Sequence, residues 1–100
     1  MAADEMLQDI RNYLDITYKD EETDKKLTGI IERGKAYLDN LAGEAQDYLI
    51  ESAPRALLFD YCRYARNNAL ELFEENFRTE LIALRIGVQA NDYAKQQGYI

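Results

Sequence analysis

The chain has 100 residues, and its 12 Lys and Arg against 19 Asp and Glu leave a formal net charge of −7. This length predicts a single domain with a small core, and this charge argues against nucleic-acid binding, which relies on Lys and Arg to neutralise phosphates. No apolar run approaches the roughly 20 residues needed to span a bilayer, so no membrane partner is expected.

The first predicted element is a short helix over residues 4–14, where apolar side chains recur at helical spacing. A polar, acidic stretch follows it, in which Asp20 or Thr23 can cap the start of a second helix. That second helix is expected to end at Gly43, because glycine often terminates helices in the left-handed conformation. Its apolar face includes Gly34, where the missing side chain would let another helix approach closely.

A third helix is predicted from a cap at Ser52 to about Asn76, with Pro54 tolerated in its first turn. One face of this helix forms an ordinary core stripe that contains Cys62, the only cysteine, which we interpret as a packing residue. The second and third helices together predict the core residues Leu27, Ile31, Leu38, Leu58, Cys62, Ala65, Ala69 and Phe73.

The third helix also carries a second apolar line. It consists of Phe59, Leu70 and, if the helix continues, Phe77, and it is flanked by Arg63 and Arg66. One interpretation is that this line packs on the chain's own first or fourth helix. The alternative is a contact with another molecule, since aromatic side chains flanked by arginines are typical of interface anchors.

The acidity of the chain lies in its first half. Residues 1–52 hold 13 acids and 6 bases, whereas residues 53–100 hold 6 of each. If the second apolar line meets another copy, its arginines are expected to face acids of the neighbour's first half, because opposite charges fix the orientation of partners. The candidate acids are Glu21, Glu22 and Glu32.

A fourth helix is predicted over residues 78–88, with Ile82 and Ile86 on a second apolar side. Residues 89–100 are polar and lack periodicity, so we expect a C-terminal tail that orders only against a partner. The candidate anchors in this tail are Tyr93, Tyr99 and Ile100. The expected organisation is therefore a helical domain over residues 1–88 followed by the tail.

The sequence offers little for catalysis. It contains no histidine, a single cysteine and no glycine-rich phosphate-binding turn. The common nucleophile, nucleotide and transition-metal sites need those residues, so no enzyme, cofactor or metal site is expected. The neighbouring carboxylates Glu71, Glu74 and Glu75 are interpreted as a solvated acidic face.

Two segments carry a family pattern: DIRNYLDITYKDEETDKKLTGIIERGKAYLDNLAG over residues 9–43 and LLFDYCRYARNNALELFEENFRTELIALR over residues 57–85. In the first segment a Tyr-Leu pair ends the short helix, an acidic loop follows, and the long helix has a Leu-x-x-Ile-Ile pattern with a second Tyr-Leu pair near its end. This arrangement resembles the opening of the phage head–tail connector family, the adaptor or head-completion proteins of tailed phages and prophages. The second segment is similar to that family's third helix and the segment after it.

The resemblance implies an all-α bundle of about four helices that serves as a structural virion protein. Copies would assemble as a twelve-fold ring on the portal protein, at the head–tail junction, after synthesis in the host bacterial cytoplasm. The ring would then dock the next connector, a stopper or a tail protein. Such a ring needs two unlike patches on each copy, one for each neighbour.

Two other classes of function stay open. A small acidic helical regulator encoded by a prophage would bind one protein partner as a stable monomer. A minor subunit of an enzyme complex would co-purify with a catalytic chain.

Overall fold

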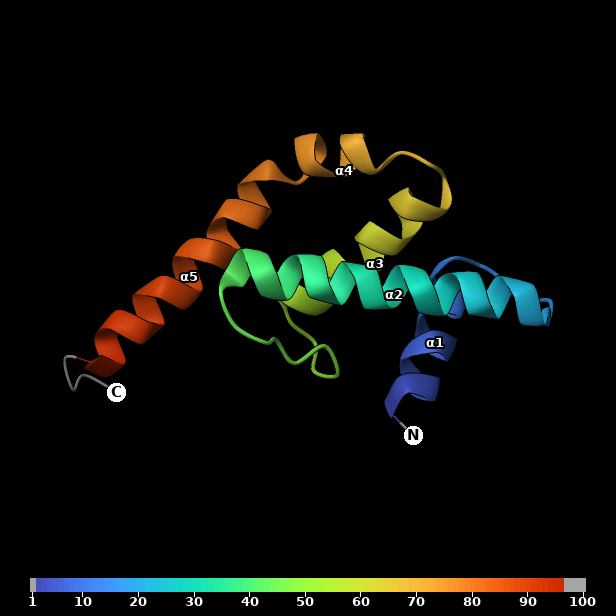
Figure 1. Cartoon of the computed structure of the whole chain (residues 1–100), viewed down its shortest axis with the longest axis horizontal. Helices are drawn as coiled ribbons and strands as arrows, with labels where there is room; N and C mark the ends of the chain where they lie inside the picture. Colours follow the sequence, from blue (N-terminus) through green and yellow to red (C-terminus); the bar gives the residue numbers. More distant parts are fainter. Residues whose placement is uncertain (1, 97–100) are drawn as a thin grey trace.

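The computed structural model describes residues 2–96, with side chains over residues 5–87. This part of the chain forms five α-helices and no β-strand, which confirms the predicted all-α class. The helices are α1 (Ala2–Tyr13), α2 (Glu21–Ala42), α3 (Ala53–Arg66), α4 (Leu70–Asn76) and α5 (Arg78–Gln96). Helix α2 runs through the middle of the molecule, and α1, α3 and α5 all contact it (Figure 1).

Helix α2 begins and ends at the predicted capping residues. The carboxylate of Asp20 accepts hydrogen bonds from Thr23 Oγ1 at 2.7 Å and from the backbone N–H of Glu22 at 3.4 Å. The hydrogen bond from Thr23 is the main reason that the pKa of Asp20 is lowered. At the other end Gly43 has a φ of 86°, and its N–H donates to the carbonyl oxygen of Asp39 at 2.9 Å.

Helix α3 packs closely on α2 at Gly34, as predicted. A Cβ atom built on Gly34 would lie 2.8 Å from Leu58 Cδ1 and 2.8 Å from Tyr61 Cδ1. At such distances a neighbouring side chain or helix must shift, so the close packing of the two helices favours glycine at this position.

Most of the predicted core is confirmed. The buried members of the predicted set are Leu27, Ile31, Leu38, Leu58, Cys62 and Phe73. The other two, Ala65 and Ala69, are only half-buried, because the chain leaves the helical path between them. Phe73 is the centre of an aromatic cluster, with ring centroids of its neighbours 5.1 to 6.4 Å away. Those neighbours are Tyr37, Tyr61, Tyr64 and Phe77.

The prediction of one continuous third helix is wrong, because the helix stops at Arg66 and α4 begins after a three-residue turn. Asn68 adopts the left-handed conformation with φ 54°. Its N–H donates to Ala65 O at 3.1 Å, and the N–H of Ala69 donates to Tyr64 O at 2.9 Å. This pair of bonds is the Schellman arrangement that ends many helices, here with asparagine in the place usually taken by glycine.

Three tyrosine hydroxyls join separate elements by donating to carboxylates. Tyr13 of α1 donates to Asp60 of α3 at 2.6 Å, and Tyr37 of α2 donates to Glu74 of α4 at 3.2 Å. Tyr48, in the loop between α2 and α3, donates to Asp39 of α2 at 2.6 Å. The pKa of each tyrosine is raised: that of Tyr13 mainly by its hydrogen bond to Asp60, and those of Tyr37 and Tyr48 mainly by burial.

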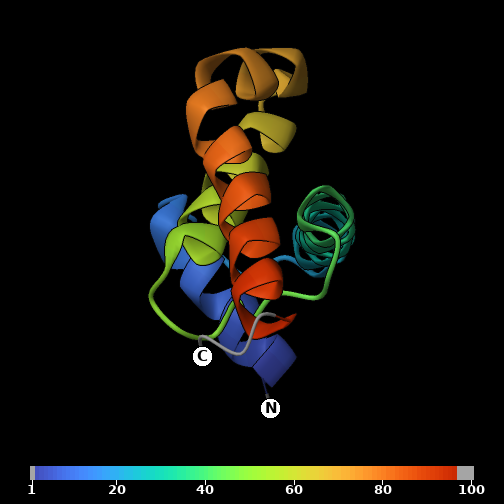
Figure 2. The same ribbon diagram turned by 90° about the vertical axis from the view of Figure 1, so that its left-hand side faces the viewer.

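Helix α5 runs to Gln96, so the predicted end of the last helix near residue 88 is also wrong. Residues 89–96 contain no proline or glycine, and the first breaker after them is Gly98. Figure 2 looks along the length of the molecule with α5 at the front. The Cα radius of gyration is 14.9 Å, larger than the ~13 Å of a compact 100-residue domain. Whether the tail gains order on assembly stays a prediction.

Candidate functional site

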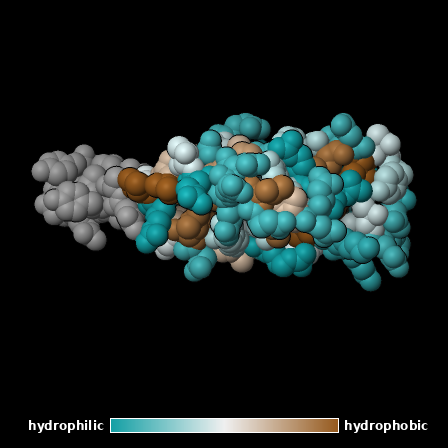
Figure 3. Space-filling view, turned by 90° about the horizontal axis from the view of Figure 1, so that it is seen from above, coloured by the Kyte–Doolittle hydropathy of each residue, from teal (hydrophilic) through white to brown (hydrophobic). Residues whose placement is uncertain are grey.

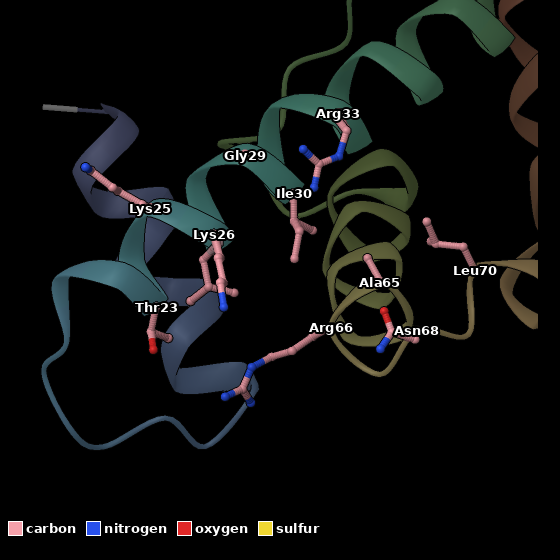
Figure 4. A pocket seen from close by; sticks show the side chains of 11 residues that line it. Thr23, Lys25, Lys26, Gly29, Ile30, Arg33, Ala65, Arg66, Asn68 and Leu70 are labelled. Atoms are coloured by element: carbon pink, nitrogen blue, oxygen red, sulfur yellow. The ribbon is translucent and has the colours of Figure 1, made fainter.

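A groove of about 710 Å³ lies between the first half of α2 and the end of α3 (Figure 4). We call it the basic groove. Buried Leu27 and Ile30 belong to its lining. Its remaining lining residues are Thr23, Lys25, Lys26, Gly29, Arg33, Ala65, Arg66, Asn68 and Leu70.

The lining contains four cations and no carboxylate, in a chain with an excess of acids. Lys26 and Arg33 extend from α2 toward α3, and Arg66 extends from the end of α3 below Lys26, whereas Lys25 points away from α3 (Figure 4). None of these four cations forms an ion pair within the described residues. Three other arginines do form ion pairs with carboxylates, namely Arg11, Arg55 and Arg63.

Arg66 is held by a single described side-chain hydrogen bond, from its Nη2 to the hydroxyl of Tyr18 at 3.1 Å. Tyr18 lies in the linker between α1 and α2 and is itself exposed. The guanidinium therefore keeps most of its hydrogen-bonding capacity, since it carries five N–H donors. It borders a second cavity of about 420 Å³ as well, which is lined by Tyr13, Leu14, Asp15, Arg63, Arg66 and Asn67.

The basic groove contains two of the four interface residues predicted on α3 and α4. Arg66 and Leu70 both line the basic groove. Phe59 instead packs on α1, with its ring 5.5 Å from that of Tyr13, so the interpretation in which Phe59 contacts the chain's own first helix is confirmed. Arg63 pairs with Asp60 of its own helix at 3.4 Å. The break after Arg66 means that Phe59 and Leu70 do not share a helical face.

Sequence reasoning missed Lys26 and Arg33 as members of the site. They are seven residues apart, which is two helical turns, so the sequence does place them on one face of α2. No local pattern places Arg66 opposite them, because that depends on how α2 and α3 pack.

The predicted acidic residues remain available for contacts. Glu21, Glu22 and Glu32 are all exposed on α2, and none of them forms an ion pair within the described residues. Tyr93 belongs to α5, but its side chain lies outside the described part, and Tyr99 and Ile100 lie outside the described residues.

The basic groove is suited to hold an anionic group. The thiol of Cys62 is buried elsewhere in the core, and burial raises its pKa to about 12. No group of three or more His, Cys, Asp or Glu side chains in the described part is placed to hold a metal ion. Among the described helices, none combines the length and apolar character needed to cross a membrane.

Comparison with known proteins identifies no family for this chain. No protein-family model matches it, and neither a curated protein nor a solved structure does. The resemblance to head–tail connectors therefore stays a prediction from the sequence.

Proposed function

We propose that this protein is a structural head–tail connector of a tailed phage or prophage. Copies form a ring beneath the portal protein, twelve-fold by family resemblance, and the ring presents a docking surface for the next connector, stopper or tail protein. The sequence resemblance suggests the family. The structural observation that carries the proposal is the basic groove.

The basic groove supports a role in binding a carboxylate-bearing protein surface. Its cations form no ion pair within the described residues, and arginine forks bind carboxylates in a fixed, often bidentate geometry. The chain itself supplies exposed acids in Glu21, Glu22 and Glu32. A second copy is therefore a suitable partner, and charge complementarity would set the register between copies.

Electron microscopy of the purified protein mixed with the portal protein of the same phage or prophage tests the proposal. A ring of this chain below the portal is the expected result. Replacing Arg66 with glutamate should weaken ring attachment about tenfold, the effect of losing roughly 1.4 kcal/mol of contact energy. The same change should alter the free energy of unfolding by less than about 1 kcal/mol, because Arg66 is exposed and unpaired within the described chain.

The matched control is Lys19→Glu, which makes the same change of charge at an exposed residue outside the basic groove. It should leave ring attachment unchanged. A second control combines Arg66→Glu with Glu22→Arg, which restores opposite charges if these two positions meet between copies. Absence of a ring with the unaltered protein would contradict the proposal. A one-to-one complex with a different protein would instead favour the regulator.

A further inference from the structure

Helix α5 has an apolar side that nothing in the described chain covers. Leu81 and Leu84 are buried against the other helices, whereas Ile82 and Ile86, one turn apart, are 51% and 57% exposed. Figure 3 shows hydrophobic side chains at the surface where α5 leaves the rest of the molecule. The sequence predicted a second apolar side on this helix, and such a side is typical of a helix with two neighbours.

Ile82 also lines a groove of about 260 Å³ between α5 and the end of α2, which we call the α5 groove. Its lining is Tyr37, Leu41, Glu74, Arg78, Leu81, Ile82 and Arg85. This volume is below the range of about 300 to 1,000 Å³ that is usual for small-molecule sites. Its lining combines apolar side chains with two arginines and one carboxylate, Glu74, which accepts a hydrogen bond from Tyr37. The two arginines outnumber this carboxylate, so the groove fits an aliphatic side chain that has carboxylates beside it.

The loop between α2 and α3 presents such side chains. Leu49 and Ile50 are adjacent, and they are 53% and 58% exposed. They are flanked by two acids, Asp47 and Glu51. Because two exposed aliphatic residues between carboxylates are of no use to the chain's own core, this tip is a candidate anchor for another molecule.

The backbone on both sides of this tip is fixed by hydrogen bonds. Tyr48 is buried, its hydroxyl donates to Asp39, and its carbonyl oxygen accepts from Arg55 Nη1 at 2.8 Å. Asp47 Oδ1 accepts from the N–H of Leu49 at 2.9 Å, and Ser52 Oγ donates to Ile50 O at 3.2 Å. A tip held in this way loses little conformational freedom on binding, which favours association.

We propose that the Leu49–Ile50 tip of one copy inserts into the α5 groove of a second copy. Leu49 and Ile50 would contact the apolar side chains of the groove, while Asp47 and Glu51 face its two arginines. In Figure 1 the loop lies below the C-terminal half of α2 and α5 slants away from it. No loop residue lines the groove of its own chain, so the contact is between chains. Because the tip and the groove are different patches, each copy can contact one neighbour through its tip and another through its groove, and such a chain of copies can close into a ring.

The decisive experiment is complementation between two variants, followed by sedimentation velocity over a concentration series up to millimolar. One variant has a damaged groove (Ile82→Asp), and the other a damaged tip (Leu49→Asp with Ile50→Asp). The unaltered protein should form oligomers that grow with concentration. Each variant alone should need at least about a tenfold higher concentration to associate. Their equimolar mixture should form dimers that grow no further, because only one intact pair of patches remains.

The control Thr28→Asp, at an exposed position of α2, should associate like the unaltered protein. Cross-linking supplies a second measurement with single substitutions. A Leu49→Cys chain mixed with an Ile82→Cys chain should form a mixed disulfide at least about ten times faster than either does with Thr28→Cys, the control position. The native thiol of Cys62 does not interfere, because it is buried.

This inference rests on the proposed function only in that both require copies to associate, and the two can fail separately. If the protein binds the portal as a ring but the mixed disulfide does not form, the tip contact is wrong and the proposed function stands. If the purified protein associates through the tip and groove but never binds a portal, the proposed function is wrong and the contact stands. A protein that is monomeric at every concentration, or a tip variant that associates normally, overturns the inference.

Discussion

Replacing Gly34 with alanine tests the packing of α2 against α3 directly. The new Cβ atom would lie 2.8 Å from Leu58 Cδ1, 2.8 Å from Tyr61 Cδ1 and 3.2 Å from Tyr61 Cε1. Both neighbouring side chains are buried, so neither has free space to move into. The helices must therefore separate slightly, or one of the two side chains must leave its preferred rotamer.

Two opposing effects set the size of the change in stability. Overpacking of a core position typically costs about 1 to 3 kcal/mol. Alanine in place of glycine inside a helix stabilises by about 0.8 to 1.0 kcal/mol. The net expectation for Gly34→Ala is a loss of about 1 kcal/mol, which for a domain of this size lowers the melting temperature by roughly 4 to 8 °C.

Gly29 is the matched control, because it lies in the same helix and a Cβ there would approach only the flexible end of Arg33, at 3.3 Å from Nη1. Gly29→Ala should therefore stabilise the protein by about 0.5 to 1 kcal/mol. Urea unfolding followed by circular dichroism gives both free energies of unfolding. If Gly34→Ala is as stable as Gly29→Ala, the close approach of α2 and α3 described above does not exist.

Three further predictions concern the turn after α3, the free thiol and the loop. Asn68→Ala should lower the free energy of unfolding by about 1 kcal/mol, whereas Asn68→Gly should leave it equal or higher, because glycine and asparagine adopt the left-handed conformation more readily than alanine. Equal losses in urea titrations of the two variants would contradict this. Cys62 should react with a thiol reagent at pH 8 at least about a hundredfold more slowly in the folded protein than in urea, since burial keeps the thiol protonated and inaccessible. An equal rate in the two conditions would mean that the core opens around Cys62. Arg55→Met should lower the free energy of unfolding by about 1 to 3 kcal/mol, because Arg55 pairs with Asp9 at 2.8 Å and donates to the carbonyl oxygen of Tyr48. A melting temperature unchanged within error would show that neither contact stabilises the fold.

The parts of the fold that depend on local chemistry were predictable from the sequence. Helix α2 begins after Asp20 and ends before Gly43. The side chain of Asp20 favours a helix start and the backbone freedom of Gly43 favours a helix end, whatever the rest of the fold. Gly34 stood out because a glycine on an apolar helical face has few purposes other than close packing. Phe73 was assigned to the core by spacing alone and is buried.

The break after Arg66 was not predicted, because apolar residues keep helical spacing across it. Asn67 and Asn68 were the available signal, since asparagine tolerates the left-handed conformation, but a solvated helical face accommodates the same pair. The basic groove was predicted only in part, through Arg66 and Leu70. Lys26 and Arg33 complete it only once α2 and α3 are packed together.

The three tyrosine–carboxylate hydrogen bonds lie where separate elements meet, so the ultraviolet absorbance of these tyrosines depends on whether those contacts are intact. Burial and the nearby charge of Glu74 raise the pKa of Tyr37 to about 12, so its neutral form is favoured in the folded state. The stability that this hydroxyl contributes is complete below the ordinary tyrosine pKa of about 10 and is lost as the pH rises toward 12. The chain has no tryptophan, so the ultraviolet absorbance of tyrosinate is not obscured. The absorbance sums over the eight tyrosines of the chain, so only the part of an alkaline titration above the ordinary tyrosine pKa of about 10 would report the release of these hydroxyls.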